Sequence, residues 1–338
     1  MKMETLIYEK LSDKTVRCGI CRHACVIGEG KRGICQIREN KDGRLLSLVY
    51  PKLIAKSIDP IEKKPIFHLK PGSFSYSIAT VGCNFKCTFC QNSDIAQMPS
   101  DTGGMIQGRD MTPEEIVKEA IDKGCESISY TYTEPTVFFE LAFDTAKLAK
   151  KSGLYNIFVT NGYMSQRAID MISPYLDAAN VDLKAFTDRF YKTYCKARIE
   201  PVKENIRHML DLGILVELTT LLIPGLNDDK KELTAMAEYI ARDLGEKTPW
   251  HISRFHPCYQ LTDRPSTPES SLMTAFEAGR NAGLFYVYTG NVPGLPSENT
   301  YCHSCKTLLV KRHGYRIENR LLLGGACPEC KTIAHGIY

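Results

Sequence analysis

The feature that most constrains the fold is an alternation of short apolar segments with helical segments, which begins near residue 75. The strand candidates are residues 75–81, 127–133, 156–160, 179–183, 216–223, 250–255 and 285–288. The helical segments between and after them are 112–123, 136–151, 166–173, 206–212, 230–244 and 271–282. This alternation predicts an α/β fold with a parallel sheet covered by helices, and six or seven repeats predict a partial or full TIM-like barrel. Barrel active sites lie at the carboxyl ends of the strands, so the residues after each strand are the functional candidates.

Three cysteines directly follow the first strand candidate. Cys83, Cys87 and Cys90 have the spacing C-x3-C-x2-C. Three thiolates can hold three irons of a [4Fe–4S] cluster and leave the fourth iron open to another ligand. The alternative is a helix that buries three packed thiols, because positions 83, 87 and 90 share one helical face. Gly82 and Asn84 favour a loop, so the sequence predicts a metal site here.

The segment around these cysteines, GCNFKCTFCQN, resembles the signature of radical S-adenosylmethionine (SAM) enzymes. Other segments resemble the AmmeMemoRadiSam-system radical SAM enzymes, relatives of pyruvate formate-lyase activating enzyme. These segments are DPIEKKPIFHLKPG, VTNGY, NVDLKAF, LTTLLIPGLND, PWHISRFHP and YVYTGNVPG. The resemblance implies a radical SAM barrel in which Cys83, Cys87 and Cys90 bind the cluster and the open iron chelates the amino and carboxylate groups of SAM. It also implies that Phe89 lies against the adenine.

Polar residues at the ends of the next strand candidates are expected to bind SAM. By resemblance, Glu134 would hold the SAM amino group through a charge-assisted hydrogen bond. A cap on the following helix is the alternative for Glu134. Asn161 offers a donor and an acceptor, and Asp182 and Lys184 would contribute to the SAM and substrate pocket. The candidates for substrate contacts are His251, Arg254 and His256, with a buried structural histidine as the alternative for either histidine.

Two further cysteine groups flank the predicted barrel. The first consists of Cys18, Cys21, Cys25 and Cys35 and predicts a small metal-binding knuckle. Zinc is one expectation there, an iron–sulfur cluster is another, and four reduced thiols in a small core are the third. The last group consists of Cys302, Cys305, Cys327 and Cys330. Its two C-x2-C pairs predict a C-terminal zinc ribbon.

The cysteine groups suggest three regions. Residues 1–72 form a Cys-rich metal-binding region with a connector, residues 73–295 the barrel, and residues 296–338 the ribbon. The connector, SIDPIEKKPIFHLKPGS, contains Pro60, Pro65 and Pro71, which predict an irregular segment. Lys63 and Lys64 within it are expected to be solvated.

Composition excludes several classes of protein. The net charge of +4 gives no argument for nucleic acid, and no apolar run is long enough to span a membrane. The first residues lack the apolar core of a signal peptide, so we expect a cytoplasmic protein. Fourteen cysteines in such a chain indicate metal or redox chemistry rather than disulfides.

The leading hypothesis is a radical SAM enzyme that cleaves SAM reductively to a 5′-deoxyadenosyl radical, which abstracts hydrogen from a substrate. The low potential that this requires predicts a reduced flavodoxin or ferredoxin as electron donor. The resemblance also associates the family with a Memo-like and an AMMECR-like protein. One alternative is activation of a glycyl-radical enzyme. Another is a non-catalytic metal-binding or nucleic-acid module.

Overall fold

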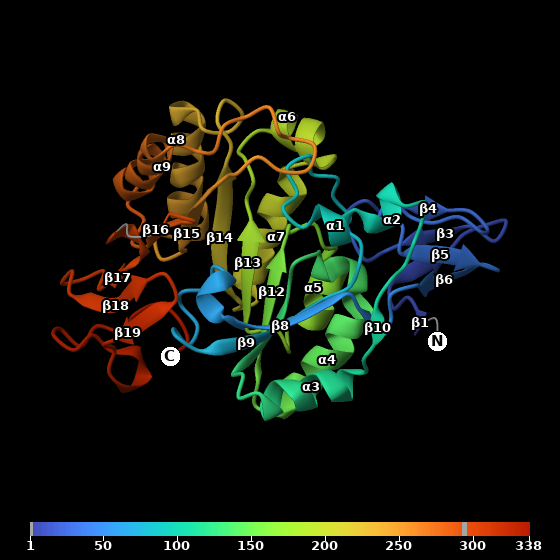
Figure 1. Ribbon diagram of the computed structural model, residues 1–338, viewed down its shortest axis with the longest axis horizontal. Helices are drawn as coiled ribbons and strands as arrows, with labels where there is room; N and C mark the ends of the chain where they lie inside the picture. Colours follow the sequence, from blue (N-terminus) through green and yellow to red (C-terminus); the bar gives the residue numbers. More distant parts are fainter. Residues whose placement is uncertain (1–2, 293–295) are drawn as a thin grey trace.

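The computed structural model describes residues 3–292 and 296–338, and an eight-stranded sheet forms its centre (Figure 1). Seven of the strands are parallel neighbours in chain order. They are β9 (Phe74–Ala79), β11 (Ser127–Tyr130), β12 (Tyr155–Thr160), β13 (Ala178–Asp182), β14 (Leu215–Leu222), β15 (Trp250–Arg254) and β16 (Val287–Gly290). The eighth strand, β8 (Ala55–Pro60), pairs with β9 in the antiparallel direction. In the described part of the chain β8 and β16 do not pair, so the barrel is partial.

Helices cover the outer face of this curved sheet (Figure 1). The longer ones are α3 (Pro113–Asp122), α4 (Phe139–Lys151), α5 (Gln166–Ile172), α7 (Glu200–Asp211), α8 (Lys230–Tyr239) and α9 (Glu269–Asn281). The shorter ones are η1 (Ile61–Lys63), α1 (Ser93–Ala96), α2 (Met98–Asp101), η2 (Pro135–Phe138), α6 (Asp188–Phe190), η5 (Pro296–Glu298) and η6 (Leu323–Gly325). Two π-helical turns, η3 (Tyr191–Cys195) and η4 (Ile240–Leu244), continue α6 and α8. No helix in the described residues is both long and apolar enough to cross a bilayer.

The expectation of an irregular connector is wrong for its first residues. Residues 55–60 form β8, which pairs with β9 along six residues. Pro60 is tolerated because it is the last residue of an edge strand, where its missing N–H costs no ladder hydrogen bond. Lys64 is also not solvated, since it is 2% exposed and its Nζ lies 2.6 Å from Asp59 Oδ2.

The rest of the connector fills the lower end of the barrel. Ile61, Ile66 and Leu69 pack against the first residues of β13 and β14 and against β12. Glu217 of β14 fixes the backbone of this segment, because its Oε1 accepts hydrogen bonds of 2.9 Å from the N–H groups of residues 67 and 68. We call residues 61–69 the bottom plug.

The N-terminal residues form two small antiparallel sheets at one side of the barrel (Figure 1). One contains β1 (Met3–Glu4), β6 (Arg44–Ser47) and β5 (Arg38–Lys41), and the other β2 (Tyr8–Lys10), β3 (Val16–Cys18) and β4 (Val26–Ile27). A separate pair joins β7 (Lys52–Leu53) to β10 (Arg109–Asp110). A buried ion pair between Arg38 and Glu140 of α4 ties these sheets to the barrel.

The C-terminal sheet lies on the opposite side of the barrel (Figure 1). It contains β17 (Thr300–Tyr301), β18 (Leu308–His313) and β19 (Arg316–Asn319). Arg312 of β18 donates to the carbonyl of Phe67 at 3.0 Å and lies 4.0 Å above its ring. This sheet therefore covers the seam between β16 and the bottom plug. The division at residues 72 and 295 stays a prediction, although β8 shows that the first region contributes a strand to the central sheet.

Candidate active site

The three central cysteines lie on a loop that leaves the carboxyl end of β9 and ends at α1. No helix includes residues 83–90, so the alternative of three thiols on one helical face is wrong. Gly82 has φ of +100°, and a Cβ there would lie 2.7 Å from Ile37 Cγ2. Only glycine fits both this backbone and this close approach. The loop is held from the other side by hydrogen bonds from the N–H groups of Lys86 and Thr88 to carbonyls of η3.

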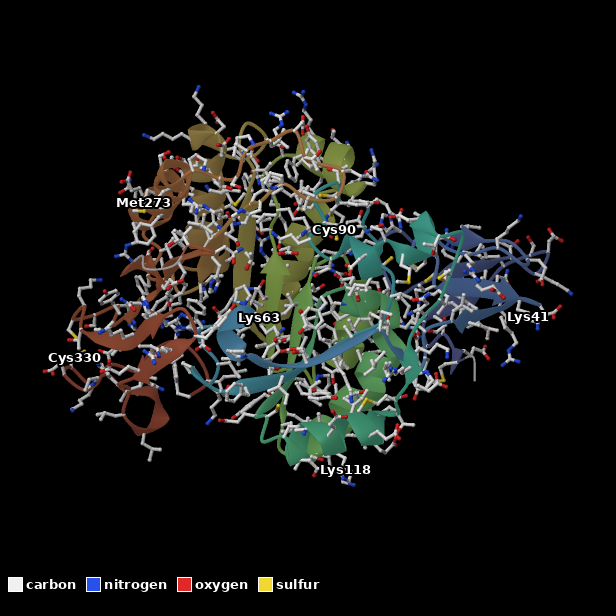
Figure 2. All side chains as sticks on the ribbon, in the orientation of Figure 1. Lys41, Lys63, Cys90, Lys118, Met273 and Cys330 are labelled. Atoms are coloured by element: carbon white, nitrogen blue, oxygen red, sulfur yellow. The ribbon has the colours of Figure 1, made fainter. Side chains whose placement is uncertain are left out.

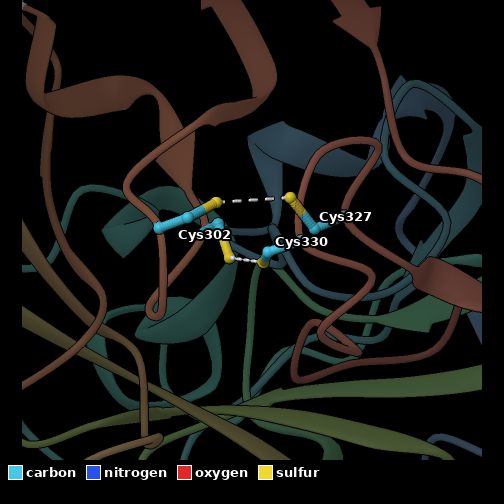
Figure 3. Close-up of side chains that lie close together, drawn as sticks. Cys302, Cys327 and Cys330 are labelled. Atoms are coloured by element: carbon cyan, nitrogen blue, oxygen red, sulfur yellow. Dashed lines mark hydrogen bonds between the residues drawn. The ribbon is translucent and has the colours of Figure 1, made fainter.

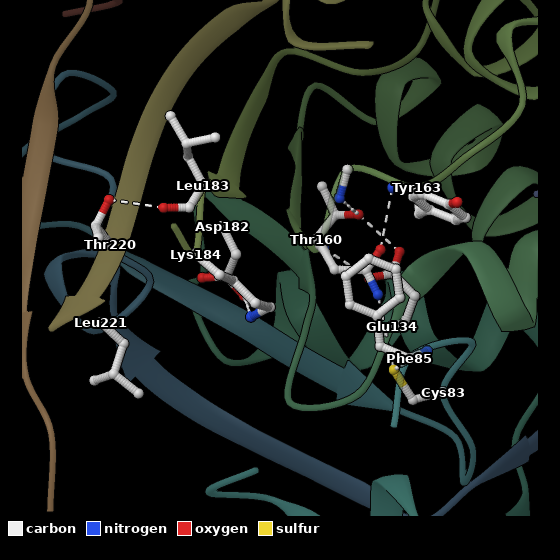
Figure 4. A network of polar contacts seen from close by, with 12 residues as sticks. Cys83, Phe85, Glu134, Thr160, Tyr163, Asp182, Leu183, Lys184, Thr220 and Leu221 are labelled. Carbon is white, nitrogen blue, oxygen red and sulfur yellow. Dashed lines mark hydrogen bonds and ion pairs between the residues drawn. The ribbon is translucent and has the colours of Figure 1, made fainter. Parts of the chain in front are cut away.

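The ends of β11 and β12 place two predicted residues beside this loop (Figure 4). Asn161 follows β12, and its Nδ2 lies 2.7 Å from Asn84 Oδ1 and 3.8 Å from Cys83 Sγ. Glu134 Oε2 accepts the N–H of Asn161 at 2.8 Å, and its Oε1 accepts the hydroxyl of Thr160 at 2.7 Å. The structure thus brings Glu134 and Asn161 together next to the first cysteine.

Glu134 also caps the turn that follows it. Its Oε1 accepts the N–H of Thr136 at 3.1 Å, and it is the N-cap of η2. Burial raises the pKa of this carboxyl, while the hydrogen bonds from Asn161, Thr136 and Thr160 oppose the rise. The capping alternative is confirmed, and a contact with the SAM amino group stays a prediction.

The other three residues expected to bind SAM meet on the opposite side of the loop. Lys184 Nζ lies 2.7 Å from Asp182 Oδ2 and 5.9 Å from the centre of the Phe89 ring. Burial disfavours the ammonium of Lys184, but Asp182 and the sulfurs of Cys87 and Cys195 outweigh it and raise the pKa. Phe89, Asp182 and Lys184 therefore form one group beside Cys87.

Sequence reasoning missed several residues of the site. Thr160 binds Glu134, and Cys195 on η3 lies beside Cys87 and raises the pKa of that thiol. No signal in the sequence marks Cys195 as different from a packed thiol. Asn84 could have been found, because it lies within the cysteine motif and contacts both Cys83 and Asn161.

The residues of the loop fit an iron–sulfur cluster and a polar ligand. The N–H of Phe85 donates to Cys83 Sγ at 3.4 Å, and this bond favours the thiolate form of that cysteine. Asn84 Nδ2 and Thr88 Oγ1 are buried and have no hydrogen-bond partner in residues 3–292 and 296–338. Buried polar groups are normally paired, so these two groups indicate a missing ligand.

A cavity of about 550 Å³ lies within the barrel near its open seam. His251, His256 and Thr219 line it, together with residues of the bottom plug and of β18. Thr219 Oγ1 is buried and lacks a partner in the described part of the chain. Of the predicted substrate contacts, His251 and His256 face this cavity, whereas Arg254 donates to the carbonyl of Thr267 at 2.8 Å.

His251 is also a buried, paired histidine. Its Nε2 lies 2.7 Å from Oε2 of Glu217, the residue that anchors the bottom plug. The alternative of a structural histidine is therefore confirmed for His251. The same ring still lines the cavity, so a substrate contact stays a prediction.

The four C-terminal cysteines converge on one point (Figure 3). Their Sγ atoms all lie within 4.8 Å of one another, with 3.6 Å between Cys302 and Cys330 and between Cys305 and Cys327. Tetrahedral zinc with Zn–S bonds of about 2.3 Å needs sulfurs separated by about 3.8 Å. This geometry fits the predicted zinc ribbon.

Removal of the predicted zinc from the ribbon should destabilise the C-terminal sheet that covers the open side of the barrel. Incubation with a strong chelator is expected to unfold residues 300–338, because few apolar residues other than the metal ligands form their core. Hydrogen exchange should then lose protection in β18, while β9 to β15 stay protected. Addition of Zn²⁺ should restore the original exchange pattern, and unchanged exchange after complete zinc removal would contradict a structural role.

Comparisons with known proteins place this chain in a family. Residues 77–237 match the family model described as the radical SAM superfamily. The chain is 47% identical over 310 residues to uncharacterized protein MJ0808 of Methanocaldococcus jannaschii, covering 92% of this chain and 91% of that protein. It is 24% identical over 180 residues to the pyruvate formate-lyase-activating enzyme of Clostridium pasteurianum, covering 50% and 72%.

Among solved structures, a radical SAM methyltransferase from Sphaerobacter thermophilus has a similar fold. The TM-score is 0.51 at 17% sequence identity, over 65% of this chain and 67% of the methyltransferase. At this identity the likeness concerns the fold, and it agrees with the partial barrel described above.

Proposed function

Because this chain belongs to the radical SAM superfamily, we propose that Cys83, Cys87 and Cys90 are the protein ligands of its [4Fe–4S] cluster. The observation that supports this proposal most strongly is the position of the three thiols. They lie on the loop after the first parallel strand, beside two buried donors without a partner in the described residues, Asn84 Nδ2 and Thr88 Oγ1. The spread of the trio also fits separate irons, because its sulfurs do not all lie within 4.8 Å.

The radical chemistry comes from the cofactor: when bound, the reduced cluster supplies the electron that cleaves SAM to methionine and a 5′-deoxyadenosyl radical, which takes hydrogen from a substrate. The protein itself binds and orients SAM. Phe89 offers its ring to the adenine, and Asn161 offers an amide to the ribose or carboxylate. The ammonium of Lys184, held by Asp182, offers a positive charge to the SAM carboxylate. The nearly complete burial of Glu134 and Phe89 keeps water from this side of the site.

The substrate is proposed to bind in the 550 Å³ cavity, next to His251 and His256. Activation of a glycyl-radical enzyme is the second candidate, and the similarity to the activating enzyme of Clostridium pasteurianum favours it. A reduced flavodoxin or ferredoxin is the proposed electron donor. A Memo-like and an AMMECR-like protein are proposed partners on the sequence resemblance alone.

Anaerobic reconstitution with iron and sulfide tests the cofactor assignment. We expect the protein with dithionite and SAM to form methionine and 5′-deoxyadenosine in equal amounts, and SAM to change the electron paramagnetic resonance (EPR) spectrum of the reduced cluster. An iron-loaded protein that neither cleaves SAM nor responds to it spectroscopically would overturn the proposal. A glycyl-radical signal in a co-expressed partner would identify the second candidate as the activity.

A further inference from the structure

The four N-terminal cysteines converge on one small cavity next to the catalytic loop. Cys18, Cys21, Cys25 and Cys35 all line this cavity. Cys18 lies at the end of β3, and the other three lie on the turns that follow. Residues 17 positions apart in the chain therefore form one thiol site.

The rest of the lining suits a closed metal centre. The apolar side chains of Ile20, Ile27 and Ile34 line the cavity together with the four cysteines. Four thiolates around one cavity are the ligand set of a closed zinc site or of an iron–sulfur cluster.

The spacing of the N-terminal thiols differs from that of the ribbon. In residues 3–292 and 296–338, only the ribbon contains three or more potential ligand atoms that all lie within 4.8 Å of one another. The N-terminal thiols share a cavity but are more widely spaced, as are Cys83, Cys87 and Cys90 of the catalytic loop. A single zinc ion requires sulfurs about 3.8 Å apart. In a [4Fe–4S] cluster each thiolate binds a different iron, so the sulfurs lie farther apart.

The N-terminal site and the catalytic loop are in direct contact. His23 Nε2 lies 2.9 Å from the carbonyl oxygen of Asn84, and Asn84 itself lines the N-terminal cavity. A Cβ on Gly82 would lie 3.4 Å from the carbonyl oxygen of Cys35. Sulfur atoms are visible in Figure 2 between the N-terminal strands and helices α1 and α2.

Further backbone hydrogen bonds fix this arrangement. The N–H of Arg22 donates to the carbonyl of Tyr163 at 3.0 Å, and the N–H of Ser165 donates to the carbonyl of Ile20 at 2.9 Å. Because residues 163–165 follow β12, the knuckle is attached at the mouth of the barrel, where Asn161 approaches Cys83. Cys21, Cys25 and Cys35 are partly exposed, so the N-terminal site lies near the protein surface.

We propose that Cys18, Cys21, Cys25 and Cys35 hold a second [4Fe–4S] cluster, which relays electrons to the catalytic one. All four of its irons have a thiolate ligand, so it leaves no position for SAM. It takes one electron from a reduced flavodoxin- or ferredoxin-like carrier and passes that electron to the catalytic cluster, without making or breaking a covalent bond. The second cluster goes beyond the proposed function. Its role as an electron relay rests on the proposed function, because the relay needs the catalytic cluster as electron acceptor.

Metal analysis of the full-length protein, reconstituted anaerobically, tests the second cluster. We expect about eight irons and eight sulfides per wild-type chain, and about four of each in the variant Cys18→Ala/Cys21→Ala. The triple variant Cys83→Ala/Cys87→Ala/Cys90→Ala should also keep about four irons, with an EPR spectrum that SAM does not change. The matched control Cys125→Ala, which removes a buried thiol outside all three groups, should keep eight.

The outcomes separate the two proposals. A wild-type protein with four irons and two zinc ions that still cleaves SAM would overturn the second cluster and leave the proposed function intact. The triple variant covers the case in which Cys18→Ala/Cys21→Ala fails to fold, because it leaves the N-terminal site untouched. If the triple variant holds two zinc ions and no iron, the proposal of a second cluster is wrong.

The relay has its own readout. In Cys18→Ala/Cys21→Ala, reduced flavodoxin should reduce the remaining cluster several-fold more slowly than in wild type. The visible absorbance of the cluster reports this reduction. Reduction by dithionite, a small reductant that can reach the catalytic cluster directly, should change less. Equal rates with flavodoxin in variant and wild type would show that electrons do not pass through the N-terminal site.

Discussion

Replacement of Cys87 by alanine is expected to abolish the formation of 5′-deoxyadenosine from SAM. Cys87 is the most buried of the three loop cysteines, and it lies between η3 and the ion pair of Lys184 with Asp182. In the proposed site, loss of this thiolate would leave one iron of the cluster without a protein ligand. The measurement is quantification of 5′-deoxyadenosine and methionine after anaerobic incubation with SAM and dithionite.

The matched control for this experiment is Cys125→Ala. This buried cysteine precedes the first residue of β11, whereas the loop follows the last residue of β9, the parallel neighbour of β11. It should retain wild-type cleavage when normalised to bound iron. Circular dichroism should show that both variants fold. Normal cleavage by Cys87→Ala would exclude Cys87 as a cluster ligand.

Replacement of Arg38 by alanine is expected to lower the free energy of unfolding by about 3–5 kcal/mol. The side chains of Arg38 and Glu140 are 2% and 0% exposed, and two hydrogen bonds of 2.9 Å join them. Arg38 also donates to Thr5 Oγ1 and to the carbonyl of Val137. Truncation leaves a carboxylate buried without its partner, which costs far more than the pair itself gains. Urea unfolding, followed by circular dichroism, measures the change.

The control is Arg44→Ala, which removes an ion pair with Glu4 on the same N-terminal sheet. Because the side chains of this pair are 59% and 39% exposed, its loss should cost only about 0–1 kcal/mol. The double variant Arg38→Met/Glu140→Leu should recover part of the lost stability, since it leaves no unpaired charge. Equal losses for Arg38→Ala and Arg44→Ala would show that burial does not decide the strength of these pairs.

Much of the barrel was predictable because its signals are local. The strand candidate 250–255 is observed as Trp250–Arg254, and the predicted helix 112–123 as Pro113–Asp122. Thr112 and Glu115 form a capping box at the start of that helix, so four consecutive residues determine where the helix begins. The cysteine loop was equally local, because strand, glycine and ligands are consecutive.

The features that sequence reasoning missed depend on contacts between distant segments. Prolines in the connector suggested irregularity, yet Ala55–Pro60 pairs with β9 because an edge strand tolerates Pro60 at its end. Lys64 can be buried because its ammonium forms an ion pair with Asp59 and a cation–π contact with the ring of Tyr132. The wide spacing of the N-terminal thiols is another such property, since the intervals between Cys18 and Cys35 suit zinc and iron–sulfur centres alike.

The contact of β18 with the bottom plug has a consequence for how this enzyme can diversify. In a closed barrel every strand is held by two neighbours, and a change of shape at one strand disturbs both ladders. Here Arg312 and its hairpin form the last part of the wall around the cavity, and the four clustered cysteines lie in the same C-terminal region. Substitutions in that hairpin can change the volume or the charge of the cavity without breaking a hydrogen bond of the central sheet. The C-terminal hairpin can therefore vary in sequence with little effect on the central sheet, and related enzymes can acquire new specificities there.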